Sequence, residues 1–132
     1  MRYLTNTYAA GALRRGREIE QLISAFEDEG RRGLRWCSIS PVKRFRGFVV
    51  RLYIVEECEW LPVDEFPAFY AADEDQDGAR TVGETESSEA AIELAERELG
   101  ADRGRWVNQG VLFDEYRDFI ESGRPLGRWK PS

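Results

Sequence analysis

The segment from residue 48 to residue 59 limits the possible folds of this chain more than any other feature. Its side chains alternate, so that one face would carry Phe48, Val50, Leu52 and Ile54 and the other Val49, Arg51, Tyr53 and Val55. Because successive side chains of a strand point to opposite faces, this pattern predicts a strand with one face in the core and the other half exposed. Such a strand needs a neighbour, and residues 34–40, which end at Pro41, are predicted to provide it.

The remaining strands are expected on either side of a polar turn later in the chain. Residues 66–72 precede the polar stretch 73–78, and residues 80–82 provide a short return arm. Polar, glycine-containing stretches between two apolar runs are typical of hairpin turns. Together with a first hairpin that turns near Lys43 and Arg44, the sequence therefore predicts an antiparallel sheet of about four strands.

Three segments show the three- and four-residue apolar spacing of amphipathic helices. They are residues 12–29 with Gly30 as a cap, a helix from Ser87 or Ser88 to Gly100, and residues 110–122, which stop at Gly123. Their apolar stripes are Ala12, Gly16, Ile19, Leu22, Ile23 and Phe26; then Ala91, Leu94, Ala95 and Leu99; then Leu112, Tyr116, Phe119 and Ile120. The order of elements predicts an α+β fold: an N-terminal helix, an antiparallel sheet of about four strands, and two C-terminal helices packed on one face.

The length of 132 residues fits a single domain, residues 1–132, built around one core. No apolar run approaches the roughly 20 residues that cross a bilayer, and the N-terminus lacks the apolar stretch of a secretory signal. We therefore expect a cytoplasmic protein with no membrane partner. Cys37 and Cys58 fall too far apart on the predicted first hairpin for a disulfide, so we expect two reduced thiols.

The chain contains no histidine, and this absence narrows the possible chemistry. Serine and cysteine nucleophiles usually need an imidazole base, and zinc sites usually include an imidazole ligand. The sequence therefore assigns no catalytic residue and calls for no cofactor, and it favours a protein that is not an enzyme. A small enzyme that uses paired carboxylates is the least favoured of three functional hypotheses, because no spacing singles out a catalytic pair.

Charge is distributed very unevenly along the sequence. Residues 56–102 contain sixteen acidic and two basic side chains, although the whole chain has a net charge of only −6. Inhibitors of basic enzymes, notably of nucleases, often use carboxylates in place of phosphate, and such charges also speed association. The leading hypothesis is therefore a non-catalytic binding protein of the immunity or antitoxin type, which blocks a basic partner; a merely solvated acidic surface is the alternative. The partner-binding candidates are Asp64, Glu65, Asp73, Asp75, Asp77, Glu89, Glu93 and Glu96, with Trp129 on the C-terminal tail as an aromatic anchor.

The first hairpin, residues 31–51, supports a different hypothesis. It is rich in basic residues and contains no acidic one, and the aromatic residues Trp36, Phe45 and Phe48 lie between them. Basic side chains can hold a nucleic-acid backbone while an aromatic ring stacks on a base. The alternative is that these arginines pair with the acidic half of the same molecule, which an overall acidic protein favours. The nucleic-acid-binding candidates are Arg35, Lys43, Arg44, Arg46 and Arg51.

The acidic stretch 73–84 also matches the spacing of a calcium-binding EF-hand loop. Asp73, Asp75, Asp77 and Glu84 occupy the ligand positions, and Gly78 occupies the turn position. Arg80 stands where such loops resemble one another in carrying an aliphatic residue, and Pro67 shortens any entering helix. An acidic hairpin turn that binds no metal explains the same residues and is preferred.

Overall fold

The computed structural model of this chain describes residues 2–42, 47–57, 70–71 and 79–130. Its elements, in chain order, are α1 (Asn6–Arg14), β1 (Ile19–Asp28), β2 (Arg31–Val42), β3 (Gly47–Glu56), β4 (Tyr70–Ala71), β5 (Ala79–Thr85), α2 (Ser88–Leu99), β6 (Val107–Asn108), α3 (Leu112–Glu121) and β7 (Gly127–Arg128). A helix, an antiparallel sheet and two later helices confirm the predicted α+β class.

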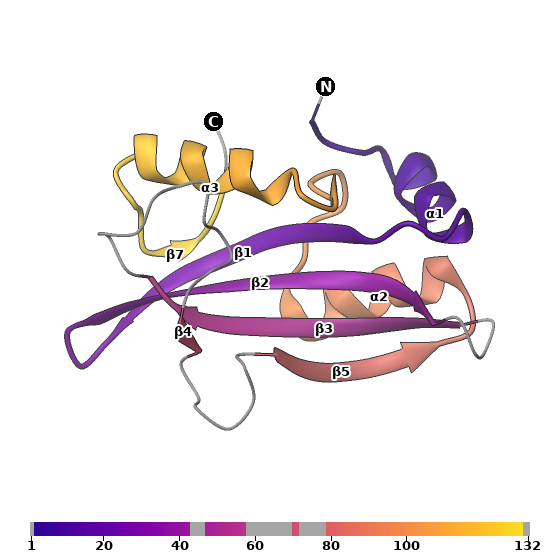
Figure 1. Ribbon diagram of the computed structural model, residues 1–132, viewed down its shortest axis with the longest axis horizontal. Helices are drawn as coiled ribbons and strands as arrows, with labels where there is room; N and C mark the ends of the chain where they lie inside the picture. The colour runs from indigo at the N-terminus through magenta and orange to yellow at the C-terminus, as the bar shows by residue number, and fades with distance from the viewer. Residues whose placement is uncertain (1, 43–46, 58–69, 72–78, 131–132) are drawn as a thin grey trace.

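The antiparallel sheet has seven strands among the described residues, more than the four or so predicted. Figure 1 shows the long strands β1, β2, β3 and β5 in that order across the sheet. Its order is β4-β3-β2-β1-β6, and β5 also pairs with β3 while β7 also pairs with β1. The strands β4, β6 and β7 contain two residues each, so β1, β2, β3 and β5 form the body of the sheet. The predicted strands 34–40 and 48–59 are confirmed in type as β2 and β3, which pair with Cys37 opposite Leu52. Their bounds differ, because β2 continues through Pro41 to Val42 and β3 ends at Glu56.

The predicted helix over residues 12–29 is wrong. Helix α1 lies earlier in the chain and ends before Gly16, whose φ of 84° is left-handed, and residues 19–28 form β1 instead. Gly30, expected to cap a helix, follows Glu29 in the turn between β1 and β2. Both turn residues have positive φ, 51° and 80°, which is the backbone of a type I′ hairpin turn.

Two features of β1 explain why its sequence has a helical period. The strand is buried on both faces from Ile19 to Ile23, so polar and apolar side chains do not alternate there. In addition, the pairing of β1 with β2 shifts between Leu22 and Ser24, so Ile23 is an extra residue that changes which face later side chains occupy. The adjacent apolar pair Leu22 and Ile23 therefore arises from a bulge, although it imitates helical spacing.

The expected second hairpin does not form between the two later strands. Both β4 and β5 pair antiparallel with β3, where Tyr70 is opposite Glu56 and Ala79 is opposite Tyr53. The two strands therefore run in the same direction along one edge of β3, and they are successive parts of one sheet edge. The polar stretch 73–78 that joins them lies outside the described residues.

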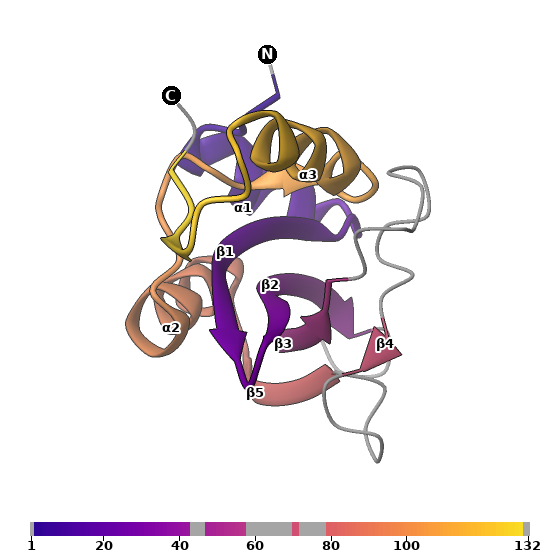
Figure 2. The ribbon, with the colours of Figure 1, turned by 90° about the vertical axis from the view of Figure 1, so that its left-hand side faces the viewer.

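Each face of the sheet contributes to a separate hydrophobic cluster. Side chains such as Ile39 and Val50 pack with α1 and α2, including Ile92 of α2. On the opposite face, residues such as Leu34 pack with α3 and the C-terminal tail. Figure 2 shows α2 and α3 beside different parts of the curved sheet. The two C-terminal helices therefore cover opposite faces of the sheet and not the single face that was predicted. Each face can hold a helix because alternate side chains of the strands place apolar groups on both sides.

A buried carboxylate joins the C-terminal segment to the sheet. Glu57, just after β3, accepts hydrogen bonds from Tyr116 Oη at 2.8 Å, Arg124 Nε at 3.0 Å and Arg32 Nε at 3.2 Å. Charged and hydroxyl donors thus compensate the cost of burying this carboxylate. The helices of the described segments are all too short or too polar to cross a membrane.

Candidate functional site

Helix α2 carries three of the predicted partner-binding carboxylates on one outward stripe. The side chain of Ser87 caps its N-terminus by accepting a hydrogen bond from the Ala90 N–H at 3.1 Å, and Gly100 ends it in the left-handed conformation. Its buried side consists of Ser88, Ala91, Ile92 and Ala95. Residues 89, 93 and 96 follow one another at spacings of four and three, so their carboxylates lie along the solvent side.

Two arginines from other parts of the chain bind the two ends of this stripe. Arg14 of α1 contacts Glu89 at 2.5 Å, and Arg103 contacts Glu96 at 2.9 Å. A hydrogen bond from the Glu89 backbone N–H and another from Ser88 Oγ, followed by Arg14, lower the pKa of Glu89. Glu93 in the middle is exposed and is in none of the ion pairs of the described residues, although its charge, after that of Glu96, contributes to the raised pKa of Arg103. We call Glu89, Glu93 and Glu96 the α2 carboxylate stripe.

The structure separates the other predicted partner-binding residues from this stripe. Five of these candidates lie outside the described residues, namely Asp64, Glu65, Asp73, Asp75 and Asp77. Trp129 is 4% exposed and packs at the edge of the Phe119 ring, with ring centroids 5.6 Å apart. Its side chain is therefore part of the core and is not an exposed anchor for a partner.

The basic candidates on β2 and β3 do not share a surface. Arg35 is paired with Ile54 and Arg51 with Ser38, so the two arginines point to opposite faces of the sheet. Arg35 lies over the Phe26 ring, 4.2 Å from its centroid, in a cation–π contact. Lys43, Arg44 and Arg46 lie outside the described residues. Arg35 and Arg51, the two candidates that the structure describes, therefore do not form one basic face for a nucleic-acid backbone.

The calcium hypothesis also loses support from the flanking elements. EF-hand loops join two helices, but strands β4 and β5 flank the stretch 73–78 here. Glu84 is exposed on β5, and its three proposed co-ligands lie outside the described residues. The residues that the structure describes contain no group of three or more side chains able to hold a metal ion.

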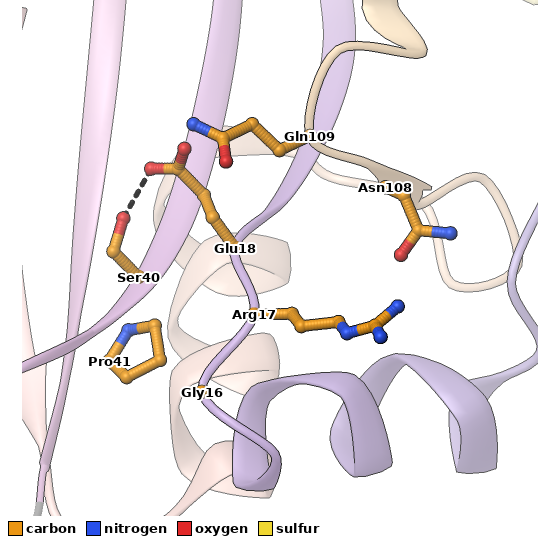
Figure 3. Close-up of a pocket in the computed structure, with 7 residues that line it drawn as sticks. All are labelled: Gly16, Arg17, Glu18, Ser40, Pro41, Asn108 and Gln109. Atoms are coloured by element: carbon orange, nitrogen blue, oxygen red, sulfur yellow. Dashed lines mark hydrogen bonds between the residues drawn. The ribbon is translucent and has the colours of Figure 1, made fainter.

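A polar pocket that the sequence interpretation missed opens at one end of the sheet. Its volume is about 540 Å³, and it lies between the α1–β1 loop, the end of β2 and the end of β6 with the residue that follows it. Its polar lining consists of Arg17, Glu18, Ser40, Asn108 and Gln109 (Figure 3). The Ser40 hydroxyl donates a hydrogen bond to the Glu18 carboxylate and holds it at the wall.

A second carboxylate, that of Glu20, is buried close to this wall. Its Oε1 accepts a hydrogen bond from the Gly110 N–H at 3.0 Å. Burial raises the pKa of Glu20 to about 7, the Gly110 hydrogen bond opposes this rise, and the nearby Glu18 charge adds to it. Glu18 and Glu20 share a face only because this segment is extended, and the predicted helix over 12–29 hid that relationship.

Comparisons of this chain with protein-family models, with curated proteins and with solved structures find no match. The α2 carboxylate stripe and the polar pocket are therefore the two features from which a function can be inferred.

Proposed function

We propose that this chain is a non-catalytic binding protein that captures a basic protein partner through the α2 carboxylate stripe. Immunity- and antitoxin-type inhibitors act in this way when their carboxylates replace the phosphate of a nuclease substrate. The observation that carries the proposal is the outward alignment of Glu89, Glu93 and Glu96 along one helix.

The flanking arginines support this proposal through orientation. Arg14 and Arg103 hold the carboxylates of Glu89 and Glu96 in fixed positions, so less side-chain entropy is lost when a partner binds. Each arginine also offsets part of the negative charge, which leaves Glu93 as the carboxylate with the least internal compensation. A partner lysine or arginine would contact Glu93 first, and acidic groups of the partner would meet Arg14 and Arg103.

The first experiment is a pull-down from the native host with the tagged full-length chain, followed by association kinetics at low and high salt. We expect a basic protein whose association rate falls as salt rises, because exposed charges are screened. Recovery of no basic protein would reject the proposed class of function.

The second experiment compares two charge reversals with the recovered partner. Glu93→Lys should slow association several-fold at low salt, whereas Glu121→Lys, an exposed reversal on α3, makes the same net-charge change away from the stripe. Neither variant should unfold the domain, since exposed charges contribute little to stability. Reversal of Glu89 or Glu96 is a poorer test, because it would also place a lysine beside Arg14 or Arg103. Equal association rates for the parent and the Glu93→Lys variant would place the interface elsewhere.

A further inference from the structure

Arg17 and Glu18 are chain neighbours of opposite charge that line the same pocket without pairing with each other. Figure 3 shows the Arg17 guanidinium directed toward Asn108 and the Glu18 side chain directed toward Ser40. The two side chains leave the backbone in different directions, and this keeps the two charges apart (Figure 3). The pocket therefore has one positive and one negative wall.

The backbone that carries both charges is fixed at several points. Helix α1 ends in a Schellman motif, where the Gly16 N–H bonds to Leu13 O at 3.0 Å and the Arg17 N–H to Ala12 O at 3.0 Å. The Glu18 carbonyl accepts a hydrogen bond from the Gln109 N–H at 3.2 Å. Because the positions of these residues are set before a ligand arrives, little ordering is needed on binding.

We propose that this pocket binds a small zwitterion, with the ligand carboxylate at Arg17 and the ligand amine at Glu18. The volume of about 540 Å³ lies within the range of small-molecule sites. Asn108 and Gln109 add amide groups that can donate to the carboxylate or accept from the amine. The ligand class is an amino acid or related compound in which several bonds separate the two charged groups, because the two walls face different directions. This site is independent of the α2 carboxylate stripe.

The test uses 6-aminohexanoate as the probe, titrated into the ¹⁵N-labelled full-length chain and followed by NMR. We expect saturable shifts of the amide signals of Asn108, Gln109 and Gly110, with a dissociation constant in the millimolar range. Two blocked analogues serve as matched ligands: N-acetyl-6-aminohexanoate keeps only the carboxylate, and 6-aminohexanamide keeps only the amine. Each should bind about tenfold or more weakly than the zwitterion, because each loses one of the two charge contacts.

Substitutions then identify the residues that hold the probe. Arg17→Gln should remove the advantage of 6-aminohexanoate over 6-aminohexanamide, and Glu18→Gln should remove its advantage over the acetylated analogue. Arg15→Gln, an exposed neighbour that does not line the pocket, should leave the titration unchanged. The proposal is overturned by the absence of saturable shifts up to roughly 50 mM. Equal binding of all three ligands, or an unchanged titration in both pocket variants, would overturn it as well.

Discussion

The indole Nε1 of Trp129 donates a hydrogen bond to Oε2 of Glu115 at 2.8 Å, and both side chains are buried. This contact joins the C-terminal tail to α3 and gives a buried carboxylate one neutral donor. The other oxygen of Glu115 lies 3.6 Å from Arg2 Nη1, so the N-terminal segment contributes a positive charge to the same site. Both ends of the described chain therefore meet at Glu115.

Replacement of Trp129 should lower the stability of the fold, because its side chain belongs to the core and not to a binding surface. Trp129→Phe keeps most of the ring volume but leaves Glu115 without its indole donor, and we expect a loss of about 2–3 kcal/mol in the free energy of unfolding. Urea denaturation measures this loss, and the exposed neighbour Lys130 provides the control substitution Lys130→Ala. A Trp129→Phe variant as stable as the parent would show that the tail does not contribute to the core.

The hydroxyl of Tyr116 should contribute measurably to stability through Glu57. Tyr116→Phe removes a 2.8 Å hydrogen bond while Arg32 and Arg124 still compensate the carboxylate, so we expect a loss of about 1–2 kcal/mol. Arg124→Met should cost more, because it removes a charge from a buried ion pair. A larger effect from Tyr116→Phe than from Arg124→Met, by chemical denaturation, would contradict this order.

The buried carboxyl of Glu20 should make the protein less stable as pH rises toward neutrality. Its folded-state pKa of about 7 lies above the ordinary value of 4.5, so the folded state keeps a proton that the unfolded state releases. Stability should therefore fall between about pH 4.5 and pH 7 and level off above that range, by roughly 3 kcal/mol in total. Glu20→Gln retains an oxygen that accepts from the Gly110 N–H and lacks the titration. The free energies of unfolding of the parent and of this variant should be compared across this pH range. The prediction is refuted if the two change with pH in the same way.

The close approach of Phe26 to Gly33 should exclude any side chain at position 33. A Cβ atom on Gly33 would lie 2.2 Å from Phe26 Cζ. The Phe26 ring cannot move aside freely, because it also makes a cation–π contact with the Arg35 guanidinium. Gly33→Ala should therefore cost about 1–3 kcal/mol by overpacking. In a Phe26→Leu background the same substitution should cost clearly less, and a double-mutant cycle from thermal or urea unfolding measures the coupling. Additive effects would mean that the ring moves aside without cost.

Local sequence patterns predicted the elements along which a single period, that of a strand or that of a helix, is unbroken. The alternation over residues 48–59 gave β3, and the capping residues Ser87 and Gly100 gave the ends of α2. The apolar spacing around Tyr116 and Phe119 likewise predicted α3. Helices α2 and α3 each bury one side and leave the other solvated, so their helical period reflects their geometry. Strand β3 was identified by its alternation, although Val49 and Val55 on the face predicted to be half exposed are buried too.

The candidate sites depended much less on local pattern. The helical spacing of Glu89, Glu93 and Glu96 predicted their common stripe, but nothing in the sequence showed that Arg14 and Arg103 would bind its ends. Those two contacts join residues 75 and 7 positions apart along the chain. Such pairs are set by how the elements pack, which periodicity does not report.

The sequence by itself determined the α+β class, the β2–β3 pair and the helices α2 and α3, because each of these elements keeps one local period along its length. Tertiary structure decided that residues 19–28 form a strand, since β1 is buried on both faces and contains a bulge at Ile23. It also decided that Trp129 belongs to the core. In the same way, it placed Arg17 and Glu18 on different walls of one pocket. The physical reason is the same in each case: burial by a distant segment overrides the local pattern, and the sequence does not state which segment will cover which face.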